Sequence, residues 1–187
     1  MNGLWVFVCG ASGAGKDSVM AWAADHLEGS PGIVFARRMV TRPALAGSDH
    51  DAITQDEFAQ LQAADALSWH WQAHGFGYGI AARYAQHVQR GDVVVVNGSR
   101  EHAIGLAERI DVRVVQIVVN APELARRLRS RGRDAPHDVE RRLARNGQFS
   151  ELRSDCTIVN QHSVADAGQQ FAAYLTGLTA EATNPVR

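Results

Sequence analysis

The sequence predicts an α/β fold in which a parallel sheet is flanked by helices on both faces. A chain of 187 residues, 45% of them hydrophobic, can bury the core of one domain. Short apolar runs alternate with helical patterns, and such alternation favours a parallel sheet. A glycine-rich loop also joins the first strand pattern directly to the first helix pattern. We therefore expect a single domain over residues 1–178 and a flexible tail over 179–187.

The first predicted strand covers residues 4–9, a short run of β-branched and aromatic residues that ends at a glycine. After the loop, apolar residues at helical spacing predict a helix from Lys16 to about Gly29. A second short strand is expected at 33–36. The sequence Thr54-Gln55-Asp56-Glu57 has the pattern of a capping box and predicts a helix that runs through Leu61.

Tryptophan, tyrosine and phenylalanine alternate with glycines between residues 65 and 92. The residues that form this mixture are Trp69, Trp71, Gly75, Phe76, Gly77, Tyr78 and Gly79. We interpret the stretch as part of a small binding flap that covers approximately residues 37–91.

The second half of the chain continues the alternation. Valine-rich runs at 93–96 and 114–119 are the clearest core strands, and a helix is expected between them near 101–109. Pro122 suits the first turn of a helix that ends near Arg129. The remaining expected elements are a helix at 138–146, a strand at 157–159 and a helix from Ser163 to Leu178.

The composition argues against several classes of partner. Nineteen basic and 20 acidic residues leave a net charge of −1, so bulk electrostatics predicts neither a nucleic-acid nor a membrane partner. The apolar run from Leu4 to Cys9 is too short for a signal peptide or a membrane span, which predicts a cytoplasmic location. Cys9 and Cys156 match neither a zinc spacing nor a disulfide framework, and we expect both to be buried and reduced. No pattern indicates an oligomeric state.

The glycine-rich loop carries the strongest functional signal. It matches G-x-x-x-x-G-K between a strand and a helix, and the N–H groups of such a loop bind a polyphosphate at the helix N-terminus. Lys16 would reach the β- and γ-phosphates of ATP; it is the single lysine beside 18 arginines, which suggests that the position needs a compact ammonium. We expect ATP to be bound by Gly10, Ala11, Ser12, Gly13, Ala14, Gly15, Lys16, Asp17 and Ser18. The fold class is therefore that of a P-loop kinase.

One loop position departs from this pattern. Asp17 stands where a serine or threonine hydroxyl normally binds Mg²⁺, and Ser18 follows it. A carboxylate is a natural ligand for Mg²⁺, so Asp17 and Ser18 are our candidate metal residues. The alternative is that Asp17 only interacts favourably with the dipole of the helix that it begins.

Eight arginines lie between residues 126 and 145, and they predict a lid that closes over the phosphates. Phosphoryl transfer depends on positioning and charge stabilisation, for which arginines are suited. At helical spacing two or three of them would face the nucleotide, and the others would be solvated. His70 and His74 could be considered a metal pair, but the lack of a nearby carboxylate disfavours this.

Over nearly its whole length, the chain resembles guanylate kinases. The pairs Tyr78-Gly79, Arg131-Gly132 and Arg142-Leu143 follow the phosphate loop and Thr41-Arg42-Pro43 in the order of that family. The resemblance implies that Arg131 and Arg142 are catalytic lid arginines that contact ATP and that Asn160 lies near the adenine.

The acceptor half differs from guanylate kinases in charge. No carboxylate occurs between Asp65 and Asp92 to read a guanine ring, and the family's paired aspartates are replaced by Asn97 and Ser99. The family's tyrosine after the Thr-Arg motif corresponds to His50. Negative charge is therefore expected to be absent beside the acceptor, where Arg38 and Arg100 add positive charge.

These substitutions resemble the branch of ribose 1,5-bisphosphate phosphokinases, which carry Gly-Lys-Asp-Ser, Thr-Arg-Pro-Ala, Tyr-Gly and Val-Asn-Gly-Ser-Arg as this chain does. The resemblance implies transfer from ATP to ribose 1,5-bisphosphate, in phosphonate breakdown, with ADP and 5-phosphoribosyl 1-diphosphate as products. The expected substrate-binding residues are Arg38, Arg42, Tyr78, Asn97, Ser99 and Arg100. A bisphosphate without a base suits arginines and neutral hydrogen-bonding groups.

Three alternatives remain open from the sequence. A nucleoside monophosphate kinase would phosphorylate GMP faster than the bisphosphate. A non-catalytic binding module on the same scaffold would not need an intact phosphate loop. A kinase with a hydroxyl acceptor would need a general base, and the flap provides no candidate.

Overall fold

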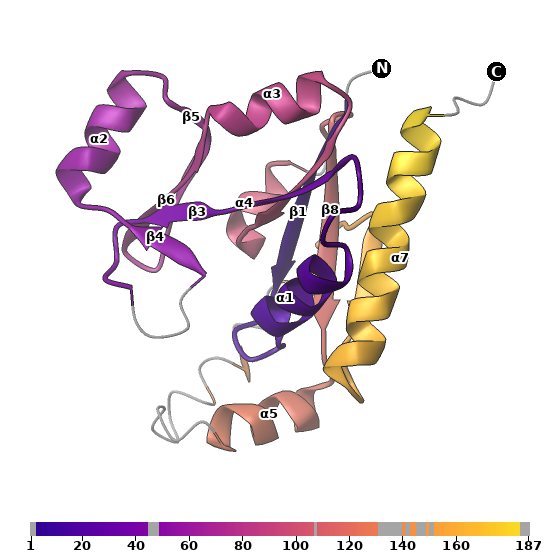
Figure 1. Cartoon of the computed structure of the whole chain (residues 1–187). Coiled ribbons are helices and arrows are strands. Elements are labelled where there is room, and N and C mark those ends of the chain that lie inside the picture. The colour runs from indigo at the N-terminus through magenta and orange to yellow at the C-terminus, as the bar shows by residue number, and fades with distance from the viewer. Residues whose placement is uncertain are drawn as a thin grey trace.

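The computed structural model describes residues 3–44, 49–106, 108–130, 140, 143–144, 149 and 152–183. It contains a five-stranded parallel sheet in the order β2-β7-β1-β8-β9 and a four-stranded sheet in the order β4-β3-β6-β5 (Figure 1). The strands of the parallel sheet are β1 (Leu4–Gly10), β2 (Ile33–Ala36), β7 (Val93–Asn97), β8 (Val112–Val118) and β9 (Cys156–Val159). Helices α1 (Lys16–His26), α4 (Arg100–Ile104), α5 (Ala121–Ser130) and α7 (Val164–Thr183) accompany it.

The parallel sheet is buried on both faces. Successive side chains of its central strand, β1, point to opposite faces, and each face belongs to a hydrophobic cluster. Val6 and Val8 of β1 belong to the core cluster that includes Phe171 of α7. Trp5 and Phe7 belong to the cluster on the opposite face. Such two-sided burial requires the continuous apolar runs from which these strands were predicted.

The second sheet forms a lobe beside the parallel sheet (Figure 1). The lobe consists of β3 (Arg38–Val40), β4 (His50–Ala52), α2 (Gln55–Ala63), β5 (Leu67–Ala73) and β6 (Phe76–Ala81), and α3 (Arg83–Gln89) leads back from it. His74 and Gly75 connect β5 to β6 with φ angles of 54° and 78°, as a two-residue type I′ hairpin turn requires. A Cβ atom on Gly77 would lie 2.8 Å from the ring of Phe58, so this glycine lets α2 pack closely on β6.

Most expected elements are present, and two helices differ in extent from the expectation. The capping box of Thr54 and Glu57 is confirmed at the start of α2. Helix α4 ends at Ile104 instead of continuing to 109. Helix α7 runs to Thr183, whereas a tail was expected from residue 179. Residues 180–182 are good helix formers, and the first proline after the start of this helix is Pro185. Most of the helix expected at 138–146 lies outside the described residues.

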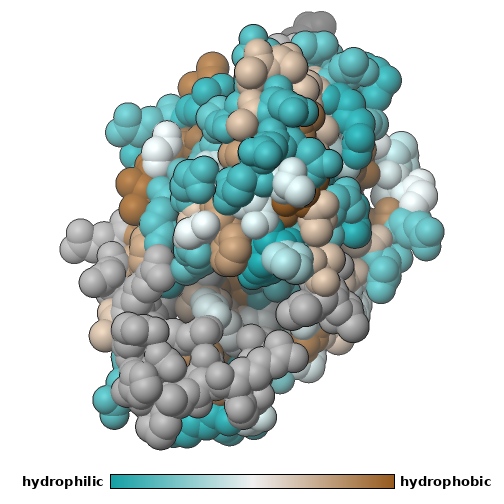
Figure 2. Space-filling view, turned by 90° about the vertical axis from the view of Figure 1, so that its left-hand side faces the viewer, coloured by the Kyte–Doolittle hydropathy of each residue, from teal (hydrophilic) through white to brown (hydrophobic). Residues whose placement is uncertain are grey.

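Both cysteines are free thiols. Cys9 is fully buried, as expected, whereas Cys156 is only half-buried at the start of β9. In the part of the chain that the structure describes, no helix combines the length and the apolar character needed to cross a membrane. On the lobe side of the molecule, hydrophilic residues dominate the described surface and hydrophobic ones are scattered (Figure 2).

Candidate active site

The phosphate loop lies between β1 and α1 and borders a cavity of about 590 Å³. Gly13 and Gly15 have φ angles of 97° and 83°, which residues with side chains rarely adopt. The loop residues that line the cavity are Gly10, Ala11, Ser12, Gly13, Gly15, Lys16, Asp17 and Ser18. Ala14, which was expected among them, is fully buried beneath the loop.

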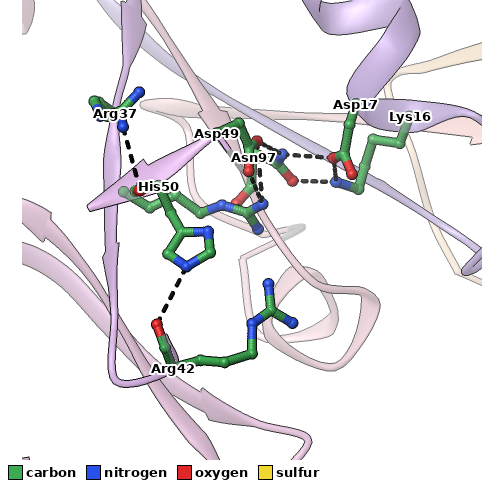
Figure 3. A network of polar contacts seen from close by, with 8 residues as sticks. Lys16, Asp17, Arg37, Arg42, Asp49, His50 and Asn97 are labelled. Atoms are coloured by element: carbon green, nitrogen blue, oxygen red, sulfur yellow. Dashed lines mark hydrogen bonds and ion pairs between the residues drawn. The ribbon is translucent and has the colours of Figure 1, made fainter. Parts of the chain in front are cut away.

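A polar network connects the loop to the lobe (Figure 3). The Lys16 ammonium donates hydrogen bonds to Asp17 Oδ1, at 2.8 Å, and to Asn97 Oδ1. The Asn97 amide nitrogen donates to Asp17 Oδ1 at 2.8 Å and to Asp49 Oδ2 at 2.7 Å. Asp49 in turn forms an ion pair with Arg38, whose Nη2 atom lies 2.9 Å from Asp49 Oδ1. The buried amide of Asn97 therefore connects the charged residues of the phosphate loop with those of the lobe.

The pKa values in this network reflect these contacts. Loss of water raises the pKa of Asp17, but the combined effect of Lys16 and the hydrogen bond from Asn97 lowers it by more. The net pKa of Asp17 therefore lies well below the ordinary range. The pKa of Asp49 is also lowered, because Arg38 outweighs the effect of burial. Burial lowers the pKa of Lys16, which the Asp17 carboxylate opposes. Both carboxylates are therefore ionised at neutral pH.

Five of the six expected substrate-binding residues line the same cavity as the phosphate loop, namely Arg38, Arg42, Tyr78, Ser99 and Arg100. The guanidinium of Arg38 lies over the Tyr78 ring, 5.9 Å from its centroid, and that ring stacks on Trp71. The guanidinium of Arg100 lies 4.1 Å from the centre of the Phe149 ring. The side chain of Ser99 accepts a hydrogen bond from His102 N and thereby caps α4.

The sixth residue, Asn97, has a different position from the one expected. Its side chain is 2% exposed at the end of β7, and its amide is occupied by Lys16, Asp17 and Asp49. The expected contact between Asn97 and a substrate is therefore not supported by its position, because its amide instead holds Lys16, Asp17 and Asp49 in place.

Asn160 requires a similar correction. It is 1% exposed, and its amide nitrogen donates to the Ala14 carbonyl oxygen at 2.8 Å. A side chain so enclosed beneath the loop has no surface to offer to an adenine ring. The structure therefore places Asn160 against the phosphate loop and gives no support to the expected contact with adenine.

The expected lid is described only in its first residues. Arg131 and Arg142 lie outside the described part of the chain. Arg126 is 68% exposed and pairs with Glu123, whereas Arg127 reaches beneath the phosphate loop. Neither lines the cavity, and the exposure of Arg126 agrees with the expectation that most of these arginines are solvated.

The sequence analysis missed Asp49, and with it the negative charge beside the acceptor half of the cavity. The parallel pairing of β3 with β4, with Arg38 opposite His50, brings Asp49 to Arg38. Arg37 pairs with Asp51 in the same way. Two neighbouring arginines followed by two aspartates in this segment were therefore the sequence signal that could have indicated the pairing. Glu101 also lines the cavity.

Histidines occupy three distinct environments around the site. His50 is buried and donates its Nε2 hydrogen to the Arg42 carbonyl oxygen at 3.3 Å, which holds the turn that carries Arg42. His70 contacts Gln62 on the surface, and His74 lines the cavity from its hairpin turn. Among the described residues, no group of three or more potential metal ligands of the His, Cys, Asp and Glu types is present.

His102 should make stability depend on pH. Burial among Phe7 and Trp71 lowers its pKa from 6.5 to about 4, to which His70 contributes. Between these pH values the unfolded chain binds the proton and the folded chain does not, so stability falls as the pH falls from 6.5 to 4. We expect a loss of about 2 kcal/mol from this half-buried ring. Urea unfolding across this range should show the slope, and the variant His102→Phe should lose it; an unchanged slope would contradict the assignment.

Comparison with known proteins finds relatives over nearly the full length of the chain. No family model matches the chain. Ribose 1,5-bisphosphate phosphokinase PhnN of Agrobacterium fabrum is 43% identical to it over 173 residues, which cover 91% of this chain and 94% of that protein. The protein of the same name from Thiobacillus denitrificans is 39% identical over 179 residues, with 94% of each chain covered.

Among solved structures, guanylate kinase from Anaplasma phagocytophilum superposes with a TM-score of 0.71 at 19% identity, over 98% of this chain and 88% of that chain. This likeness confirms the expected α/β fold. The identity to the PhnN proteins over nearly the full length goes further. The chain therefore belongs to the family of ribose 1,5-bisphosphate phosphokinases.

Proposed function

We propose that the chain transfers the γ-phosphoryl group of ATP to the 1-phosphate of ribose 1,5-bisphosphate, which gives ADP and 5-phospho-α-D-ribose 1-diphosphate. The observation that carries this proposal is one cavity that is lined both by the phosphate loop and by Arg38, Arg42 and Arg100. Arginines bind phosphate through charge-assisted hydrogen bonds, and the acceptor has two phosphates to offer them. A cytoplasmic location belongs to the same proposal.

The proposed step is a direct displacement. An oxygen of the acceptor's 1-phosphate forms a bond to the γ-phosphorus, while the bond from that phosphorus to the bridging oxygen breaks and its electron pair leaves on ADP. The attacking oxygen is already anionic, so no general base is required. Lys16 would stabilise charge on the transferring group, and the arginines would hold the acceptor in line.

Asp17 and Ser18 fit a bound Mg²⁺. Both line the cavity next to Lys16, the Asp17 side chain is 66% exposed, and carboxylate and hydroxyl oxygens are the ligands that Mg²⁺ prefers. When bound, the ion would neutralise phosphate charge. A second carboxylate, that of Asp49, accepts a hydrogen bond from Asn97 nearby.

The variant Asp17→Ala should therefore need more Mg²⁺. We expect the concentration for half-maximal turnover to rise on the order of 10-fold, because one oxygen ligand or its water-mediated equivalent is lost. Asp17→Asn keeps one carbonyl oxygen and a hydrogen-bonding amide. Its Mg²⁺ concentration for half-maximal turnover should therefore lie between those of Asp17→Ala and the wild type. If Asp17 served only the helix dipole, the Mg²⁺ titration would be unchanged and stability would fall by about 0.3–1 kcal/mol. Magnesium titrations of turnover, run beside thermal melting, distinguish the two results.

The acceptor is tested by product identity. The pure protein is incubated with ATP, Mg²⁺ and either ribose 1,5-bisphosphate or GMP, and the products are identified by ³¹P NMR. We expect GMP to be the poorer acceptor, because it lacks the second phosphate and would leave an arginine unpaired at a cost of about 1–3 kcal/mol. Faster phosphorylation of GMP would favour a nucleoside monophosphate kinase, and no turnover with either acceptor would favour a binding module.

A further inference from the structure

We infer that Arg127 and Asn160 are positioning residues for ATP, which act by fixing the peptide group between Ala14 and Gly15 of the phosphate loop. The inference rests on the ATP binding that is part of the proposed function and not on the identity of the acceptor. Neither side chain lines the cavity, so their effect on the nucleotide would pass through the backbone.

Two donors converge on one carbonyl group beneath the loop. The Asn160 amide nitrogen lies 2.8 Å from the Ala14 oxygen, and Arg127 Nη1 lies 3.4 Å from the same oxygen. Arg127 Nη2 also donates to the Asn160 carbonyl oxygen at 2.9 Å. Arg127 therefore holds Ala14 both directly and through Asn160.

The planarity of the peptide group converts this contact into a position for a donor. In a trans peptide the C=O and the following N–H point in opposite directions. With the Ala14 oxygen held beneath the loop, the Gly15 N–H is turned to the opposite side, where Gly15 lines the cavity. The positive charge of Arg127 near the oxygen also polarises the peptide, which makes that N–H a stronger donor to an anionic phosphate.

Gly15 and Asn160 depend on each other sterically. A Cβ atom on Gly15 would overlap the Asn160 amide nitrogen, and Gly15 has a φ angle of 83°. The close approach of Asn160 to the loop is therefore possible only with glycine at this position.

Glu123 fixes the direction of Arg127. Its Oε1 atom accepts a hydrogen bond from Arg127 Nε at 2.7 Å, one helical turn earlier on α5. Hydrogen bonds from Arg126 and Arg127 lower the pKa of Glu123 to about 2, so this carboxylate is charged near neutral pH. Arg126 shares Glu123 but is directed to solvent, which makes it a matched control.

The test measures ATP binding by calorimetry with Mg²⁺, and the KM values for ATP and for the acceptor, below the melting temperature of each variant. We expect Arg127→Met to raise the Kd and KM for ATP about 10-fold and to change the acceptor KM by less than about 2-fold. Arg127→Lys keeps the charge but loses the planar guanidinium, so it should give a smaller rise in the Kd and KM for ATP. Asn160→Ala should resemble Arg127→Met. Arg126→Met should bind ATP as the wild type does.

Two results would overturn the inference alone. One is a wild-type ATP affinity in folded Arg127→Met and Asn160→Ala, and the other is an equal loss in Arg126→Met, which would indicate a general charge effect. A wild-type protein that binds no ATP would instead overturn the proposed function, and the inference with it.

Discussion

The variant Lys16→Ala is expected to lose turnover on the order of 10²-fold or more while its fold remains intact. The reason is that the ammonium acts on the transferring charge, whereas its described contacts are polar ones with Asp17 and Asn97 rather than contacts within the hydrophobic core. ADP release with ATP, Mg²⁺ and ribose 1,5-bisphosphate measures the loss.

Two controls make this result specific. A melting temperature near that of the wild type shows that the variant is folded. Lys16→Arg keeps the charge, and it should still lose most activity because a planar fork cannot replace a compact ammonium in the loop. Turnover near the wild-type value in Lys16→Ala would show that the assignment of the phosphate loop is wrong.

The variant Arg38→Leu should raise the KM for ribose 1,5-bisphosphate about 10- to 100-fold, because a hydrogen bond to a charged group contributes about 1.5–3 kcal/mol. Arg38 lines the cavity and is largely buried between Asp49 and the Tyr78 ring. The KM for ATP should change much less, since the proposed function assigns Arg38 to the acceptor. Steady-state kinetics with each substrate varied in turn measures both values.

The neighbouring Arg37 provides the matched control. It pairs with Asp51, is half-exposed and does not line the cavity. Arg37→Leu should therefore leave the acceptor KM near the wild-type value. Equal effects of the two substitutions, or an effect on ATP instead of the acceptor, would contradict the assignment of Arg38.

The parts of the structure that depend on neighbouring residues could be predicted from the sequence. The phosphate loop is a continuous segment, and the strands on either side of the central β1 are valine-rich runs with no competing helical pattern. The capping box at Thr54 is likewise contained within four residues. In each case the signal and the structure occupy the same short stretch of chain.

The lobe could not be predicted to the same extent because its pairings are remote and its strands are short. Strands β3 and β4 have three residues each, too few to show a period. Asp49 reaches the site only through the register of these two strands, and Asn97 joins it from 48 residues away. The arginines and aspartates in and next to β3 and β4 are visible in the sequence. Which of them lie opposite each other depends on the pairing of the two strands, and the sequence alone does not show this pairing.

Asn160 illustrates a different limit. The resemblance to guanylate kinases transfers a position along the chain, whereas the direction of a side chain depends on what surrounds it. Here a glycine with positive φ leaves room for the Asn160 amide beneath the loop, and Arg127 of α5 holds its backbone. These contacts involve three separate elements, and none is visible in a motif.

The chemistry of the one lysine has a practical consequence for covalent labelling. Lys16 is the single lysine of the chain, and because burial lowers its pKa, a larger fraction of this amine is unprotonated at a given pH than of an ordinary surface amine. The 18 arginines are not acylated under the same conditions, so the α-amino group is the other amine that competes for an acylating reagent. An activated ester small enough to enter the cavity should modify Lys16 selectively. Bound ATP should then protect it, which makes the extent of acylation a measure of nucleotide occupancy.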